Sequence, residues 1–242
     1  MQIRIDTHSH TSFSADGIGH PLGMMDAARK KGLQAFIITD HDTCAALDYL
    51  EQEGLIHADG SAGDDLLVLP GQEVSTRHGH LLCLGTRLPS MKGCAAAEAI
   101  EEIHARGGLA IPAHPYDRFR SGIREGGLNS LPIDGIEVFN AASTFKIYNQ
   151  QARGYAAAKG LTMFAGSDAH HEDALGAAHM ILDVDELTQS SVMNALRTGG
   201  ELVEKYQTRS NFLKKTFHNC FRSKTPAQLV RKLEKNSEPA ET

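Results

Sequence analysis

The feature that most constrains this chain is a repeated alternation of short apolar runs with longer helical patterns. The apolar runs are QIRID, AFIITD, LLVLPGQEV, HLLCLG, GLAIPAH, GIEVF and LTMFAGSD. Between them lie segments such as HPLGMMDAARKKG and YNQQARGYAAAKG, where glycine marks the expected helix ends. Strands that are apolar along their whole length are typical of a sheet buried on both faces. The alternation therefore predicts an α/β fold with a parallel sheet of seven strands, closed as a barrel.

The charge of the chain changes sign near its end. Residues 1–204 carry 15 basic and 27 acidic side chains, a net charge of -12, whereas residues 205–242 carry 9 and 3, a net charge of +6. We expect a catalytic domain over 1–204 and a basic helical extension over 205–242 with a disordered end. The extension either packs on the acidic body or contacts nucleic acid, an anionic surface or a partner.

Several protein classes are disfavoured by what the sequence lacks. No apolar run approaches the roughly 18 residues of a membrane-spanning helix, and MQIRID lacks the layout of a secretory signal. The cysteines, Cys44, Cys83, Cys94 and Cys220, form no CxxC pair, so neither a zinc ribbon nor a disulfide framework is indicated. We expect a cytoplasmic protein without a membrane span.

Histidine and carboxylate side chains recur where the predicted strands end. On the first strand, Asp6, His8 and His10 alternate and so point to one side. Later strand ends carry Asp40, His41, Asp42, Glu73, His78, His80, His114, Asp168, His170 and His171. Because the carboxyl ends of barrel strands form one rim, these side chains are expected to converge. Imidazole and carboxylate without thiolate suit zinc, manganese or iron, and the number of ligands indicates two or three ions.

The ordered motifs DTHSHTSFSADG, ITDHDT, GQEVS, GHLLCLG, AHP and GSDAHH resemble the PHP superfamily, the polymerase and histidinol phosphatase group of metal-dependent phosphoesterases. The resemblance runs from Met1 to about residue 200 and implies a distorted (β/α)7 barrel with a trinuclear metal cluster. It implies one ion at His8, His10, Glu73 and Asp168, a second at Glu73, His80 and His114, and a third at Asp16, His41 and His170. Asp6 and Asp42 are expected to accept hydrogen bonds that fix the ligand imidazoles.

The expected reaction is hydrolysis of a phosphomonoester or short phosphodiester, in a small metabolite or nucleotide, by a hydroxide that bridges the cations. Candidates for the catalytic proton transfers are His78, His171 and Asp42. Candidates for phosphate contacts are Arg77, Arg118, Arg120, Arg124 and Asn140, because arginine forks match phosphate oxygens.

Two other functions stay open. A metallohydrolase of non-phosphate esters or amides would use the same cations on a carbonyl group. A nucleic-acid-associated exonuclease or proofreading module would use the basic extension to bind its substrate. Three aromatic side chains, Phe119, Phe145 and Tyr148, would stack on a base if the substrate is a nucleotide, or else pack within their loops.

Overall fold

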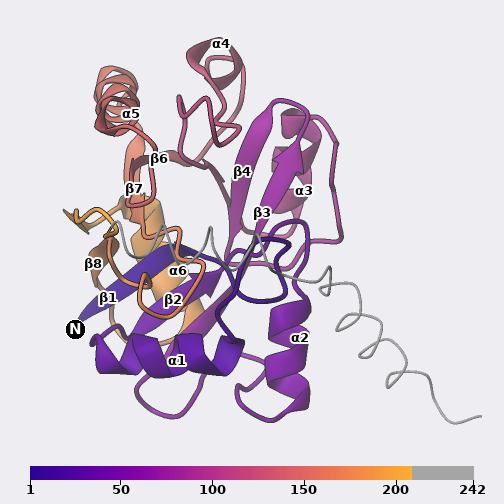
Figure 1. The fold of residues 1–242 in the computed structure, drawn as a ribbon, viewed down its shortest axis with the longest axis vertical. Coiled ribbons are helices and arrows are strands. Elements are labelled where there is room, and N and C mark those ends of the chain that lie inside the picture. Colours follow the sequence, from indigo (N-terminus) through magenta and orange to yellow (C-terminus); the bar gives the residue numbers. More distant parts are fainter. Residues whose placement is uncertain (209–242) are drawn as a thin grey trace, which may run out of the picture.

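The computed structural model describes residues 1–208, and within them strands and helices alternate along most of the chain (Figure 1). The strands are β1 (Gln2–Ser9), β2 (Ala35–Ile38), β3 (Leu67–Thr76), β4 (Gly79–Leu84), β5 (Leu109–Pro112), β6 (Gly135–Asn140), β7 (Thr162–Gly166), β8 (His179–Asp183) and β9 (Glu201–Val203). The helices are α1 (Pro21–Lys30), α2 (Ala45–Gln52), α3 (Ala96–Ala105), α4 (Glu125–Leu128), α5 (Lys146–Lys159) and α6 (Gln189–Thr198).

Seven of these strands form one mixed sheet in the order β5-β4-β3-β2-β1-β8-β9, and β6 and β7 form a separate parallel pair. β8 pairs antiparallel with the first half of β1. β7 lies beside the second half, where the Asp168 N–H donates to the His8 carbonyl oxygen at 2.8 Å. At the other side of the pair, the Asp134 N–H donates to the Ala110 carbonyl oxygen of β5 at 3.1 Å. The β6–β7 pair thus lies between β5 and β1, and the sheet curls.

The predicted α/β class is confirmed, but the expectation of a parallel sheet of seven strands is wrong. β4 runs antiparallel to both β3 and β5, and the unpredicted strands β8 and β9 also pair antiparallel. β3 and β4 are antiparallel, with Thr76 paired to Gly79. Only Arg77 and His78 lie between the paired residues, and so short a connection can make a hairpin but not a parallel crossover. A closed (β/α)7 barrel stays a prediction, and the predicted helical extension lies, from residue 209 onward, outside the described residues.

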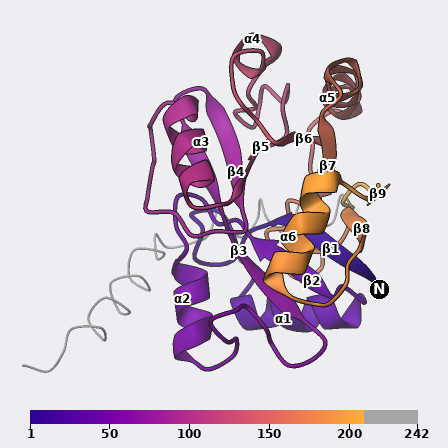
Figure 2. The ribbon, with the colours of Figure 1, turned by 180° about the vertical axis from the view of Figure 1, so that it is seen from behind.

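The strands of the sheet bury side chains on both faces. In β2, Ala35 and Ile37 join one apolar cluster, whereas Phe36 and Ile38 join another that includes residues of α1 and α2. The first cluster also takes in Leu196 and other residues of α6, and Figures 1 and 2 show α1 and α6 on opposite sides of the sheet. This two-sided burial explains why the strands read as continuous apolar runs.

Within residues 1–208, no helix has the length and apolar character that crossing a membrane requires.

Candidate metal centre

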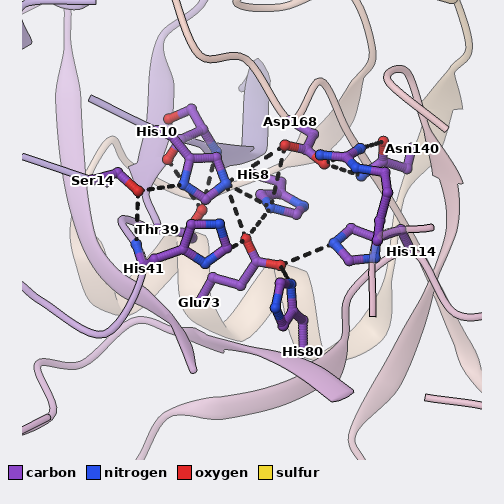
Figure 3. A network of polar contacts seen from close by, with 12 residues as sticks. His8, His10, Ser14, Thr39, His41, Glu73, His80, His114, Asn140 and Asp168 are labelled. Carbon is purple, nitrogen blue, oxygen red and sulfur yellow. Dashed lines mark hydrogen bonds and ion pairs between the residues drawn. The ribbon is translucent and has the colours of Figure 1, made fainter. Parts of the chain in front are cut away.

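Seven of the titratable side chains predicted from the strand ends lie together in one polar network (Figure 3): His8, His10, His41, Glu73, His80, His114 and Asp168. His8 lies in β1 and His10 directly after it, while His114 follows β5 and Asp168 follows β7. Because β4 runs antiparallel, its first residues lie beside the end of β3 and bring in His80. The structure therefore brings together residues that are far apart in the sequence.

Glu73, in β3, is the centre of this cluster and is almost fully buried. Its Oε1 atom lies 2.7 Å from His80 Nδ1 and 3.0 Å from His114 Nε2. Its Oε2 atom lies 3.1 Å from His8 Nε2 and 3.0 Å from His10 Nε2. Each oxygen thus faces its own pair of imidazoles, which is the arrangement expected of a carboxylate shared between two cations.

Asp168 closes the inner part of the cluster. Its Oδ1 atom lies 3.5 Å from His10 Nε2 and 3.9 Å from His8 Nε2. Its Oδ2 atom accepts a hydrogen bond from Asn140 Nδ2 at 2.9 Å and pairs with Arg120 Nη1 at 2.6 Å. The two oxygens are therefore divided, with Oδ1 directed to the imidazoles and Oδ2 held by neutral and cationic donors.

Asp16, His41 and His170 form the outer part of the cluster. His170 Nε2 lies 2.8 Å from Asp16 Oδ2, and His41 Nε2 lies 3.7 Å from Asp16 Oδ1. His41 Nδ1 lies 3.6 Å from Glu73 Oε2, which links this group to the inner one. The side chain of Asp16 is 33% exposed, so the outer group is open to solvent.

The spacing of these atoms fits divalent cations. Ligand atoms about 2.1 Å from a tetrahedral ion are about 3.4 Å apart. The atoms of His8, His10, Glu73 and Asp168 show separations from 3.0 to 3.9 Å, including 3.2 Å between the Nε2 atoms of the two histidines. Four overlapping groups of cluster residues each place their ligand atoms within 4.8 Å of one another. The donor set therefore fits the metal site predicted from the sequence.

Four buried polar atoms of the cluster also lack hydrogen bonds within the described part of the chain. They are His41 Nδ1, His114 Nδ1, Asp168 Oδ1 and His80 Nδ1, of which the last lies 2.7 Å from Glu73 Oε1 but outside hydrogen-bond geometry. An unsatisfied buried polar atom costs about 1–3 kcal/mol, so proteins rarely keep several together without a ligand. Their concentration in residues that also have the right spacing supports cation binding.

Burial sets the protonation of the histidines. It lowers the pKa of His10 to about 4 and also lowers the pKa of His41 and His114. Burial acts in the same direction on His8 and His80, but neighbouring carboxylates outweigh it and hold the pKa of both above the usual range. Neutral imidazole is the form that binds a cation, so protons compete with the cation mainly at His8 and His80.

The carboxylates of the inner cluster stay ionised. Burial alone would raise the pKa of Glu73 and Asp168. The surrounding histidines, together with Arg120 beside Asp168, hold the pKa of both carboxyl groups well below the usual range. Charged carboxylates together with neutral imidazoles are ligands that suit a divalent cation such as zinc, manganese or iron.

The backbone is strained at the same place. Within residues 1–208, the residues other than glycine that have positive φ are Asp42, His114, Tyr116, Ser121 and Asp168. Asp168 has a φ of 52° and His114 a φ of 30°, and both are candidate ligands. Such conformations cost about 1–3 kcal/mol each and are concentrated at functional sites.

Glu137 is a part of the site that sequence reasoning missed. It is buried in β6, where its Oε1 atom accepts a hydrogen bond from His8 Nδ1 at 2.9 Å. Its Oε2 atom accepts from the His114 N–H at 2.6 Å and from Asn140 Nδ2 at 3.0 Å. Because a carboxylate can only accept, it holds the proton of His8 on Nδ1 and leaves Nε2 directed at Glu73. The signal in the sequence is one acidic residue inside the apolar run GIEVF.

Two further residues, Gln207 and Gly166, contact the backbone or the side chains of the candidate ligands without being ligands themselves. Gln207 Nε2 donates to the carbonyl oxygens of Ser167 at 2.7 Å and Asp168 at 3.2 Å, and so braces the strained backbone. Gly166 leaves no room for a side chain, because an added Cβ would lie 2.5 Å from His8 Cβ. Neither role can be read from the sequence, since both depend on how distant segments meet.

The residues predicted to transfer protons, or to fix the imidazoles, have other partners. Asp42 accepts a hydrogen bond from the Ser75 N–H at 2.8 Å, and exposed His78 accepts one from the Ala96 N–H at 3.1 Å. Asp6 accepts from three backbone N–H groups, so the expectation that it fixes a ligand imidazole is wrong. His171 is buried next to His170 in the chain.

Of the predicted phosphate contacts, Arg120 and Asn140 reach the cluster. Arg120 Nη1 bonds both Asp168 and the Asn140 side-chain oxygen, the latter at 3.2 Å. The side chain of Arg120 is 19% exposed, so it borders both the cluster and solvent. The other three predicted arginines, Arg77, Arg118 and Arg124, are exposed.

Comparison with known proteins agrees with the geometry. Residues 6–98 match the PHP domain family model, and residues 146–200 match the PHP-associated model. An uncharacterized protein of Methanocaldococcus jannaschii is 31% identical over 163 residues, which cover 62% of this chain and 89% of that protein.

Solved structures share the fold at low sequence identity. A two-domain protein from Bacteroides vulgatus, which contains a predicted PHP-like metal-dependent phosphoesterase, has a TM-score of 0.68 at 20% identity, covering 91% of this chain and 70% of that one. Endonuclease Q, in complex with a duplex substrate carrying an abasic lesion, has a TM-score of 0.66 at 17% identity. That match covers 84% of this chain and 58% of the endonuclease. The matched segments and the relative in M. jannaschii together show that the chain belongs to the PHP domain family.

Proposed function

We propose that this protein is a metal-dependent phosphoesterase that hydrolyses a phosphate ester of a small metabolite or nucleotide. The observation that carries the proposal is Glu73, one buried carboxylate that lies within 3.1 Å of a nitrogen atom in each of four imidazoles. The phosphoesterase assignment in the name of the B. vulgatus neighbour agrees with it.

Nine side chains would hold two or three ions of zinc, manganese or iron. The family resemblance divides them into His8, His10, Glu73 and Asp168; Glu73, His80 and His114; and Asp16, His41 and His170. The groups whose ligand atoms lie close together in the structure share members with all three. When bound, such cations supply Lewis acidity and lower the pKa of a coordinated water, so no side-chain nucleophile is required.

The chain's own residues orient the site and bind the substrate. Asn140 and Arg120 fix the Asp168 carboxylate through its Oδ2 atom. Since Arg120 also borders solvent, its remaining N–H groups can donate to the phosphate oxygens of an incoming ester. Arg120 thus combines a positioning role with substrate binding.

Protonation of the leaving alkoxide needs a donor near the cluster. The backbone N–H groups of Ser75 and Ala96 already occupy acceptor atoms of Asp42 and His78, respectively. We test His171 first, because it is buried and directly follows the candidate ligand His170 in the chain. His171→Gln is expected to lower kcat more for esters of poor leaving groups than for esters of good ones.

A nucleic-acid substrate is the second candidate. Endonuclease Q shares the fold, and its structure contains a duplex substrate with an abasic lesion, although the chain spans little more than half of that endonuclease. The net charge of +6 over residues 205–242 would attract a polyanion. Nuclease activity that is lost when the salt concentration is raised would favour this second candidate over the first.

The test is phosphate release by the full-length protein, loaded with manganese or zinc, over a panel of metabolite esters, nucleotides and oligonucleotides. Carboxylic esters and amides assayed in parallel test the remaining alternative. We expect phosphate release that a chelator abolishes and that Arg120→Ala lowers, with Arg106→Ala, which removes an exposed arginine paired with Glu102, as the matched control. Hydrolysis of carboxylic esters alone would contradict the proposal.

A further inference from the structure

Exposed aromatic side chains gather beside the metal cluster. Within residues 1–208 the exposed large apolar side chains are Met1, Leu22, Phe119, Phe145 and Ile147. Three of these five belong to the segments that follow His114 and Asn140. Phe119 is 72% exposed and Phe145 54% exposed, and their ring centroids are 6.0 Å apart. Exposing two large apolar rings side by side costs hydrophobic free energy, and such exposed patches are typical of binding sites.

A buried carboxylate joins the two loops that carry the rings. Asp117 Oδ1 accepts a hydrogen bond from the Phe119 N–H at 3.1 Å. Its Oδ2 atom accepts from the Thr144 N–H at 2.8 Å and from the Ser143 hydroxyl at 3.4 Å. Asp117 therefore ties the loop before α4 to the loop before α5, and these helices lie at the same end of the molecule in both views (Figures 1 and 2). The backbone segments that carry the two rings are thus held in place before any ligand binds.

The pair is also joined directly to the proposed phosphate contacts. Phe119 directly precedes Arg120, so the Cα atoms of these two residues are about 3.8 Å apart. The guanidinium of Arg120 in turn bonds Asp168. Phe145 ends the short segment that begins at Asn140, whose amide bonds the same carboxylate. Movement of either loop would disturb the residues that hold Asp168.

The chemistry around the rings is both aromatic and cationic. The planes of the two rings meet at 58°, an open angle in which a third flat ring can lie on one face and meet the edge of the other. Exposed Arg118 and Lys146 flank Phe119 and Phe145 in the chain. A ligand that suits this surface carries a flat ring together with negative charge.

We propose that Phe119 and Phe145 form a subsite for a flat aromatic ring attached to the phosphate ester that the metal cluster hydrolyses. This inference rests on the proposed function and adds the substrate class, a ring-bearing phosphate ester. The ring belongs either to a nucleoside or to a simple aryl group, since both present the same face to the pair.

The experiment compares four esters with the full-length, metal-loaded protein: adenosine monophosphate, ribose 5-phosphate, phenyl phosphate and glycerol 3-phosphate. Phe119→Ala and Phe145→Ala are expected to raise KM for the ring-bearing esters roughly 5- to 100-fold. The same variants should leave kcat, and KM for the two esters without a ring, within about twofold. Preference for adenosine monophosphate over phenyl phosphate would assign the subsite to a nucleoside, and the reverse to an aryl group.

Two control variants make the result specific. Phe119→Tyr keeps the ring and should restore the KM of the wild type. Leu22→Ala removes an exposed apolar side chain on α1 and should change no KM value. Equal KM values for all four esters, unchanged by the phenylalanine variants, would overturn the inference while leaving the proposed function intact.

A second readout separates failure of the inference from failure of the proposed function. If neither these four esters nor the wider panel of phosphate esters is hydrolysed, the proposed function fails, and the subsite is tested by the fluorescence of 2-aminopurine riboside. Because the chain has no tryptophan, stacking on the pair can be followed by quenching of this probe. Quenching that does not depend on Phe119, or a dimer that Phe119→Ala dissociates, would refute the subsite.

Discussion

Replacing Glu137 by glutamine tests how the site fixes its histidines. The substitution keeps the shape of the side chain but exchanges one accepting oxygen for an NH₂ group. In the structure Oε1 accepts from His8, and Oε2 accepts from the His114 N–H and from Asn140. Glutamine cannot satisfy all three donors.

Each orientation of the new amide has a defined cost. With its oxygen at the position of Oε2, the NH₂ group faces His8 Nδ1 and moves the histidine proton to Nε2, the atom 3.1 Å from Glu73. With its oxygen at the position of Oε1, the NH₂ group faces the His114 N–H and the Asn140 amide, two donors that were 2.6 and 3.0 Å from Oε2. In the first orientation the Nε2 lone pair of His8 is no longer available to bind a cation. In the second, His114 is displaced from the position in which it could bind one.

We expect Glu137→Gln to weaken cation binding by about 10- to 100-fold, or about 1.4–2.8 kcal/mol. The dissociation constant is measured by competition with a chromogenic chelator, using full-length protein. Glu51→Gln, which removes a surface carboxylate paired with Arg87, is the matched control and should bind the cation like the wild type. Unchanged affinity in a folded Glu137→Gln variant would refute the assignment of Glu137 as the residue that orients His8.

Three further predictions concern the support of the site. Gly166→Ala should weaken cation binding and lower the melting temperature, because its methyl group would lie 2.5 Å from His8 Cβ; a variant with wild-type values would contradict this. Gln207→Ala should weaken cation binding while changing the melting temperature little, since it removes the hydrogen bonds to the Ser167 and Asp168 carbonyl oxygens. The control Gln189→Ala, which removes a hydrogen bond to the Gly85 carbonyl oxygen, should leave cation affinity unchanged. Because carboxylates hold the pKa of His8 above its usual range, cation affinity should rise as the pH is raised through neutrality. Cation binding should also release protons, which calorimetry in buffers of different ionisation enthalpy measures. An affinity that does not depend on pH would contradict this prediction.

The parts of the site that could be predicted are those fixed by strand periodicity. Alternation along β1 places His8 and His10 on one side, and both do reach the same carboxylate. His114 and Asp168 follow strands, so the rule that strand ends meet at one edge was enough to group them. Asp16 precedes α1 in an irregular segment and was identified by the family resemblance rather than by periodicity.

The parts that could not be predicted depend on contacts between distant segments. Glu137 lies inside an apolar run, and its three donors come from three different parts of the chain. Gln207 follows the last strand, at a position assigned to the basic extension. The arginines of the loop after His114 could not be ranked, because a loop's side-chain directions are set by tertiary contacts such as that between Arg120 and Asp168. The β3–β4 hairpin, by contrast, could have been recognised because only residues 75–79 separate the apolar runs LLVLPGQEV and HLLCLG, too few for a parallel crossover.

The most direct test of the account is the metal content of the full-length protein. Mass spectrometric metal analysis after dialysis against manganese or zinc should give two or three ions per chain for the wild type. Glu73→Gln should lose at least one ion, because Glu73 is the ligand shared by two groups of histidines. A folded wild-type protein that retains no ion, or a Glu73→Gln variant with undiminished metal content, would contradict the central claim.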